Sequence, residues 1–266
     1  MERVVAVIPV RMGSSRFPGK PLAPLHGLPM IEHVYRRAQL CDQLDHVYVA
    51  TCDDEIRTAA QDFGATVLMT SATHERATDR VAEAAEHFAS DIVVMIQGDE
   101  PMITPEMITT SLAPLRSDRS TSCVNLVHRI RSLREFLDPN TIKVVADLNE
   151  NALYFSRSPI PMVDFEESNA KIFKQVCVIP FRRDCLMEFS HLPPTPLERA
   201  ESIDMLRLLE HGRSVRLVET EVTSHAVDTP ADLQLVEALM NDDPLMRQSF
   251  ASKLGDWLRH GQYRPR

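Results

Sequence analysis

The sequence predicts an α/β fold: a mostly parallel sheet with helices on both faces. Short runs rich in β-branched residues alternate with helical patterns, beginning with 4–10, 30–40 and 46–51. The extended runs are apolar throughout and do not alternate in polarity, which is typical of strands covered by helices on both sides. The first half of the chain is therefore expected to be doubly wound.

Each element of the first half follows from its local pattern. In the helix expected over 30–40, Ile31, Val34, Tyr35 and Ala38 fall on one face. A Thr or Asp cap is expected to start another helix over 78–88. The remaining elements are a helix over 55–63 and strands over 65–70 and 91–97.

After residue 120 the pattern changes. Two extended runs within 141–161 flank a turn at 149–151, which predicts an antiparallel hairpin projecting from the parallel sheet. Pro196 is placed to start a helix and Gly212 to stop it. The other expected elements are strands over 176–181 and 214–222 and a helix over 229–240 with Pro230 in its first turn.

The domain organisation predicted from these elements is simple. Residues 1–240 form a single domain with the hairpin inserted at about 141–160, and residues 241–266 form a C-terminal helical tail. The tail spaces its apolar residues as a rough stripe, which we interpret as packing on its own domain or on a second copy. These residues are Leu245, Met246, Phe250, Leu254, Trp257 and Leu258.

Composition excludes several classes of partner. The chain has 266 residues, 29 Lys and Arg against 38 Asp and Glu, and a formal net charge of −9, so a nucleic-acid polymer is not expected to bind. No apolar stretch approaches the ~20 residues that span a bilayer, and the start of the chain lacks a signal-peptide pattern. We therefore expect no membrane association and a cytoplasmic location. The five cysteines are scattered and never in C-x-x-C spacing, which indicates reduced thiols with no zinc site or disulfide framework.

A cationic loop follows the first expected strand, at residues 8–22. Arg11, Arg16 and Lys20 surround a turn of Gly13, Ser14 and Ser15. Ligands of open α/β sheets collect at the carboxyl ends of strands, and backbone N–H groups with fixed cations are the ingredients of a polyphosphate site. The loop matches neither the dinucleotide-binding glycine pattern nor the P-loop, which disfavours a redox Rossmann enzyme and a P-loop ATPase.

Two acidic side chains are candidate metal ligands. Asp99 comes where the apolar strand over 91–97 breaks into Gly98 and two acids, and its oxygens suit Mg²⁺, which carboxylates and substrate phosphates hold together. Gly98 allows a close backbone approach. Asp228 is the second candidate. Either Asp could instead be an ordinary helix cap. The two residues indicate a metal site only when they are taken together with the cationic loop.

Five motifs in this order carry a resemblance to a known family. They are "IPVRMGSSRFPGKPL", "ATDRVAEA", "IQGDEPM", "ALYFSRSPIP" and "AVDTPADL". Together they resemble the 3-deoxy-manno-octulosonate cytidylyltransferases, the CMP-Kdo synthetases of Gram-negative bacteria, over approximately residues 3–240. The resemblance implies a nucleotidyltransferase fold, a Mg²⁺-dependent reaction of CTP with a 2-keto-3-deoxy sugar acid, release of pyrophosphate, and a homodimer.

The resemblance also implies roles for individual residues. Arg11, Lys20 and Asp99 are the catalytic candidates, and Asp99 and Asp228 are the magnesium ligands. Arg80, Arg157, Gln175 and Asp204 are expected to face the sugar acid. The expected nucleotide-binding residues are Val10, Arg11, Gly13, Ser14, Arg16, Lys20, Gln97 and Gly98.

The sequence departs from the family pattern on the sugar side. Gln175 and Ile179 stand where the family has His and Tyr, and Asp204 and Met205 stand where it has Glu and Gln. The usual Ser-Gly before Thr78 has become Arg-Ala at 76–77. Changes of hydrogen-bonding groups in such a site alter substrate preference strongly. Three interpretations therefore stay open: activation of 3-deoxy-manno-octulosonate or a close relative, a cytidylyltransferase for another acidic acceptor, and a catalytically silent nucleotide-binding paralogue.

Overall fold

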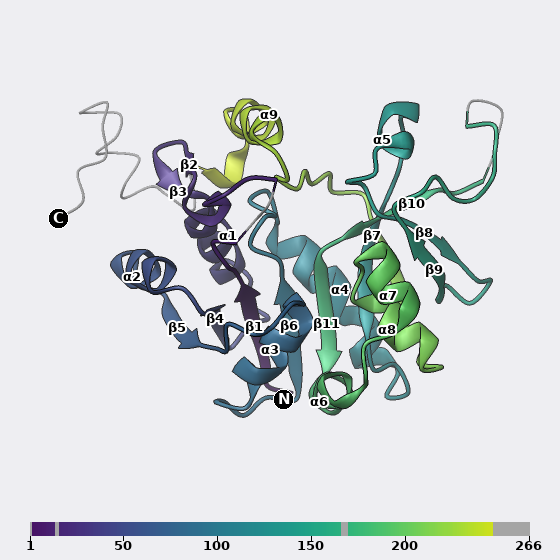
Figure 1. Ribbon diagram of the computed structural model, residues 1–266, viewed down its shortest axis with the longest axis horizontal. Helices are drawn as coiled ribbons and strands as arrows, with labels where there is room; N and C mark the ends of the chain where they lie inside the picture. The colour runs from purple at the N-terminus through teal and green to yellow at the C-terminus, as the bar shows by residue number, and fades with distance from the viewer. Residues whose placement is uncertain (1, 14–15, 166–169, 247–266) are drawn as a thin grey trace.

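The computed structural model describes residues 2–13, 16–165 and 170–246, and its centre is a five-stranded sheet (Figure 1). The strand order is β11-β6-β1-β4-β5, and every pair is parallel except β11 against β6. The strands are β1 (Val4–Pro9), β4 (His46–Thr51), β5 (Thr66–Met69), β6 (Ile92–Ile96) and β11 (Val178–Arg182). The mostly parallel sheet expected from the sequence is confirmed.

Helices cover both faces of this sheet, because successive side chains of a buried strand point to opposite sides. Ala6 and Ile8 of β1 pack in one apolar cluster with α1 (Met30–Gln39), α2 (Asp54–Asp62) and α4 (Pro105–Ser117). Val7, between them, packs in the opposite cluster with α3 (Ala77–Ala85) and α6 (Arg183–His191). The predicted helices at 30–40, 55–63 and 78–88 are therefore confirmed within a few residues.

A second five-stranded sheet has the order β12-β7-β10-β8-β9 and is parallel only between β12 and β7. Its strands are β7 (Val124–Arg129), β8 (Lys143–Ala146), β9 (Ala152–Ser156), β10 (Phe173–Val176) and β12 (Arg216–Thr220). The hairpin expected over 141–161 is β8 and β9, and Asp147 forms its turn by accepting from the backbone N–H groups of Asn149 and Asn151, each at 2.8 Å. It was expected to project from the parallel sheet, but it belongs to this second sheet instead.

The strand expected over 176–181 is interrupted at Cys177, so that β10 lies in one sheet and β11 in the other. The Cys177 carbonyl accepts from Gln97 N at 3.1 Å, which draws the chain across to the end of β6. A bridge between Cys123 and Phe181 also joins the sheets. The two sheets therefore meet beside the end of β6.

The prediction of a single helix over 196–212 is wrong, because this segment forms two short helices. It consists of α7 (Pro196–Glu201) and α8 (Met205–Glu210), separated by Ser202 in the left-handed region at φ 58°. Asp204 turns inward here, where Thr78 donates to its carboxylate. Gly212, at φ 71°, follows the end of α8 as predicted.

A smaller group of elements packs above the sheet, near the top of Figure 1. It contains the strands β2 (Pro24–Leu25) and β3 (Leu28–Pro29) and the helix α9 (Pro230–Met240). The 3-10 turn η1 (Lys20–Leu22) comes just before β2 and packs through Leu22 on the cluster of α1 and α2. Met246, the last described residue, is buried with them, and the other residues of the predicted tail stripe except Leu245 lie outside the described residues. The short helix α5 (Leu133–Leu137) lies beside the second sheet. The division into a domain of residues 1–240 and a tail stays a prediction.

Candidate active site

The candidate site lies at the carboxyl ends of β1 and β6, which are neighbours in the sheet. The chain leaves β1 toward α1 and β4 on one side, whereas it leaves β6 toward α4 and the second sheet. This is the point where strand order reverses, and ligands of open α/β sheets bind there. Met12, in the loop after β1, donates its N–H to Asp53 at 2.8 Å, which ties that loop to the end of β4.

Three distant residues meet at this edge of the sheet. The Lys20 ammonium donates to Asp99 Oδ2 at 2.7 Å and lies 3.5 Å from Asp228 Oδ1. It also donates to the Val227 carbonyl at 2.8 Å, and Val227 N donates to the Asp99 carbonyl at 2.9 Å. All three charged side chains are largely buried, with exposed fractions of 13% for Lys20, 21% for Asp99 and 17% for Asp228.

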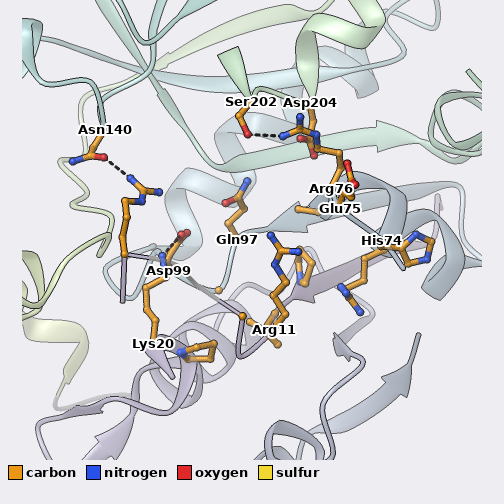
Figure 2. Close-up of a pocket in the computed structure, with 18 of the residues that line it drawn as sticks. Arg11, Lys20, His74, Glu75, Arg76, Gln97, Asp99, Asn140, Ser202 and Asp204 are labelled. Carbon is orange, nitrogen blue, oxygen red and sulfur yellow. Dashed lines mark hydrogen bonds and ion pairs between the residues drawn. The ribbon is translucent and has the colours of Figure 1, made fainter. Parts of the chain in front are cut away.

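Arg16 completes this cluster from the solvent side. Its guanidinium lies 2.9 Å from Asp228 Oδ1 and donates to the Asn140 side-chain carbonyl, the second contact being drawn in Figure 2. Two cations thus face two carboxylates. The cationic loop and both predicted acidic residues are on the same edge of the sheet.

The electrostatics of the cluster suit a bound cation. Burial, reinforced by the Asp99 charge, raises the pKa of Asp228. Burial lowers the pKa of Lys20, but Asp99 and Asp228 outweigh it, so that its pKa lies above the ordinary value. Two neighbouring carboxylates beside a site for phosphates are the oxygen ligands that Mg²⁺ uses. Asp99 and Asp228 are therefore the residues that could hold a magnesium ion here. The described ranges contain no group of three or more His, Cys, Asp or Glu placed to hold a metal.

A first cavity of about 760 Å³ opens beside the cluster (Figure 2). Figure 2 shows the Lys20–Asp99 pair at one side, Arg76 with Ser202 at the other, and Gln97 between them. The predicted nucleotide-binding residues that line this cavity are Val10, Arg11, Gly13, Arg16, Lys20, Gln97 and Gly98. Ser14 lies outside the described residues. The volume is in the range of small-molecule sites.

A second cavity of about 530 Å³ lies against the second sheet. It shares a set of lining residues with the first cavity, namely Arg16, Gln97, Asp99, Asn140, Arg157, Ser202 and Asp204. Asp228 lines only the second cavity, and Lys20 lines only the first. The charged cluster is therefore placed where two ligands could meet.

Of the four residues expected to face a sugar acid, three line the second cavity. These are Arg157, Gln175 and Asp204, and the departing residues Ile179 and Met205 line it as well. Gln175 donates to the Asn125 side-chain carbonyl at 2.6 Å. Arg157 donates to the Glu201 and Pro139 carbonyls.

Arg80 differs from the other three. It lines the first cavity and not the second, and it donates to the Thr70 hydroxyl. Its assignment to the sugar acid stays a prediction that its position does not favour.

Several site residues were missed by sequence reasoning. Asn140, which accepts a hydrogen bond from Arg16, comes just before the hairpin and belongs to none of the motifs. Lys174 and Glu135 form an ion pair at 2.6 Å in the second cavity, and Ser224 lies beside them. Glu100 was missed as well, and the only sequence signal for it is that it directly follows Asp99.

Glu100 is buried beside Asp99 and its environment favours the protonated form. Ser224 Oγ donates to its carboxylate at 2.7 Å and Cys177 N at 3.4 Å, but burial dominates and raises its pKa to about 7.

The first prediction concerns Glu100→Gln. The folded pKa is above the unfolded one, so the contribution of Glu100 to the free energy of unfolding is fully present below about pH 4.5 and is lost as the pH rises through 7. Between these limits the stability of wild type relative to Glu100→Gln should fall by about 3 kcal/mol. Urea unfolding of both proteins across this range measures it, and a pH-independent difference contradicts it.

Gly98 is needed for packing at the end of β6. A Cβ added there overlaps the Val10 side chain and comes within 3.5 Å of the Pro9 carbonyl. Gly98→Ala should therefore push Val10 outward and lower the free energy of unfolding by about 1–3 kcal/mol. Because Arg11 and Asp99 flank these residues, kcat/KM should fall too. Thermal unfolding of Gly98→Ala, Val10→Ala and the double variant Val10→Ala/Gly98→Ala is the test. If the double variant loses as much stability as the two single variants together, the overlap is not the cause.

Comparison with known proteins defines the class. A solved CMP:2-keto-3-deoxy-manno-octonic acid synthetase complexed with CTP superposes with a TM-score of 0.83 at 43% identity, covering 91% of this chain and 99% of that one. A 4-diphosphocytidyl-2C-methyl-D-erythritol synthase from Anaerococcus prevotii shares the fold alone, with a TM-score of 0.60 at 13% identity over 90% of this chain and 99% of that one. Fold and site together are those of a nucleotidyltransferase.

The sequence comparisons narrow this class. A cytidylyltransferase family model matches residues 5–219. The 3-deoxy-manno-octulosonate cytidylyltransferase of Geobacter metallireducens is 46% identical, covering 88% of this chain and 96% of its own length. The Escherichia coli protein of the same name is 45% identical, covering 90% and 97%. The chain belongs to the family of the 3-deoxy-manno-octulosonate cytidylyltransferases.

Proposed function

We propose that the protein transfers the cytidylyl group of CTP to 3-deoxy-manno-octulosonate or a closely related sugar acid. An acceptor hydroxyl oxygen attacks the α-phosphorus, a new P–O bond forms, the bond to the departing pyrophosphate breaks, and the hydroxyl proton passes to solvent. The observation that carries the proposal is the meeting of Lys20, Asp99 and Asp228 where the two cavities adjoin. The relatives named as 3-deoxy-manno-octulosonate cytidylyltransferases support the same reaction.

The first cavity is the proposed CTP site. Arg11, Arg16 and Lys20 supply positive charge to the triphosphate, and Gln97 lies near the cytosine and ribose. Arg11 and Lys20 stabilise the charge that develops on the leaving pyrophosphate, so that catalysis depends mainly on positioning and electrostatics. Gly13, which lines this cavity, brings its backbone N–H group to the phosphates. Ser14 stays a predicted phosphate ligand outside the described residues.

Asp99 and Asp228 are the proposed magnesium ligands. When bound, Mg²⁺ neutralises phosphate charge and polarises the α-phosphoryl group. The carboxylates hold their positions through the Val227–Asp99 backbone hydrogen bond and the Arg16–Asp228 ion pair. A bound ion would take over the neutralisation of Asp99 and Asp228, and Lys20 would then serve the phosphates.

The second cavity is the proposed acceptor site. Arg157 faces the acidic group of the sugar, and Gln175 and Asp204 contact its hydroxyls. The experiment is pyrophosphate release from CTP and Mg²⁺ with 3-deoxy-manno-octulosonate, against a panel of other sugar acids. Release that requires this acceptor supports the proposal, and release with none of the panel refutes it in favour of a silent nucleotide-binding paralogue.

A different acidic acceptor is the second candidate. It is favoured by the position of Gln175, Ile179, Asp204 and Met205, which all line the second cavity and all depart from the family pattern. The same panel distinguishes the two candidates, because this one predicts a higher kcat/KM for another acid than for 3-deoxy-manno-octulosonate.

The remaining proposals concern assembly and location. We propose that the protein is a cytoplasmic homodimer. The family resemblance implies the dimer, and analytical ultracentrifugation at micromolar concentration tests it. Among the described residues, no helix combines the length and apolar character required to cross a bilayer.

A further inference from the structure

Arg76 is tied to the opposite wall of the first cavity. Its Nη1 donates to Ser202 Oγ at 2.6 Å (Figure 2). Its Nη2 donates to the Glu198 carbonyl at 3.3 Å, and its Nε lies 3.4 Å from Glu198 Oε1. All three guanidinium nitrogens therefore contact the segment around the end of α7. This leaves Arg76 poorly placed to serve as a phosphate ligand, although it lines the cavity.

The segment that Arg76 holds is the junction of α7 and α8. Ser202 adopts φ 58°, a region that non-glycine residues occupy at a cost unless the surroundings hold them there. The amides of Ser202 and Ile203 both donate to the Glu198 carbonyl that Arg76 also contacts. The Arg76 guanidinium thus holds this conformation through two acceptors, the Glu198 carbonyl and the Ser202 hydroxyl.

A second connection joins the same two segments. Thr78, two residues after Arg76, donates its N–H and its hydroxyl to Asp204 at 3.1 and 2.8 Å. Ser202 and Asp204 line both cavities, so the junction is a shared wall. The Lys20–Asp99 pair lies at the other side of the first cavity (Figure 2), so the contacts of Arg76 do not involve it.

We propose that Arg76 is a positioning residue that fixes Ser202 and Asp204, and thereby sets the fit of the acceptor in the second cavity. It acts through the junction of α7 and α8 and not through contact with CTP. The inference rests on the proposed function for the identity of the acceptor, so its test combines kinetics with a measurement that needs no substrate.

Hydrogen exchange of the free protein is the first measurement. Arg76→Ala should speed exchange of the Ser202 and Ile203 amides by about tenfold, the effect of losing charged hydrogen bonds at this junction. Ser202→Ala should act in the same direction, and Arg76→Lys should restore part of the protection because an ammonium can still donate to one acceptor. Arg199→Ala, which changes an exposed arginine on α7 itself, is the matched control and should change neither amide.

Kinetics are the second measurement. Arg76→Ala should raise the acceptor KM by about tenfold, with the CTP KM within twofold and kcat within threefold of wild type. The double variant Arg76→Ala/Ser202→Ala should have the same acceptor KM as Arg76→Ala alone, because the serine change removes a hydrogen bond that Arg76→Ala has already removed.

Two results overturn the inference: unchanged exchange at Ser202 and Ile203 in Arg76→Ala, or a CTP KM that rises as much as the acceptor KM. The exchange measurement also separates this inference from the proposed function. If wild type releases no pyrophosphate with any acid while the exchange still responds to Arg76, the reaction has been misassigned but the positioning contact stands.

Discussion

Lys20→Ala is expected to lower kcat by roughly 100- to 1000-fold, the loss typical of removing one preorganised charge that faces a developing anion. The physical reason is that the Lys20 ammonium, held at 2.7 Å from Asp99, is the buried cation at the junction of the triphosphate and the carboxylates. Steady-state pyrophosphate release measures the effect. The matched control is Lys171→Ala, which removes an exposed lysine paired with Glu219 and should leave kcat unchanged.

The same variant has a predicted effect on stability. Without Lys20, Asp99 and Asp228 repel each other, and burial already raises the pKa of Asp228. Added Mg²⁺ should therefore raise the melting temperature of Lys20→Ala more than that of wild type. A kcat within threefold of wild type would contradict the catalytic role, whatever the melting temperatures.

Arg207→Met is expected to produce the largest loss of stability. Arg207 donates to both Glu198 oxygens at 2.8 and 2.7 Å and to Asp79 at 2.8 Å, and the exposed fractions of Arg207 and Glu198 are only 2% and 0%. Its guanidinium also lies 4.2 Å from the centre of the Phe189 ring. Burial lowers the pKa of Arg207, but Glu198 and Asp79 more than compensate and raise it above its ordinary value.

The methionine would leave Glu198 buried without a full counter-charge. The free energy of unfolding should fall by about 3–5 kcal/mol, as when one partner of a buried ion pair is removed. Chemical denaturation measures this. Arg213→Met, which breaks an exposed pair with Glu188, is the control and should cost at most about 1 kcal/mol. Adding Glu198→Gln to Arg207→Met should recover part of the loss, and no recovery would show that charge burial is not the cause.

The part of the site that could be predicted from sequence obeys one topological rule. Lys20 and Asp99 follow the first and fourth strands of the parallel pattern, and carboxyl ends of parallel strands share an edge. This rule alone predicts that the cationic loop and Asp99 lie at the same edge of the sheet. Asp228 follows no strand of that sheet, so the rule does not place it beside Lys20, and it was a candidate only through its residue type and its motif.

The rest depends on contacts that local pattern does not encode. An apolar run over 176–181 has the same composition whether or not it changes sheets at Cys177, and the change depends on its backbone hydrogen bond with Gln97. The segment 196–212 has the apolar periodicity of one helix. The Arg76–Ser202 and Thr78–Asp204 hydrogen bonds interrupt it. Tertiary hydrogen bonds override local propensity at both places, and both are at the cavities.

The central claim is that Asp99 and Asp228 hold a divalent cation together with the phosphates of CTP. Calorimetric titration of CTP with and without Mg²⁺ tests it most directly, in wild type, Asp99→Asn and Asp228→Asn. The account predicts that Mg²⁺ tightens CTP binding to wild type by at least about tenfold and that either asparagine variant loses most of this gain. The same Mg²⁺-dependent gain in all three proteins would contradict it.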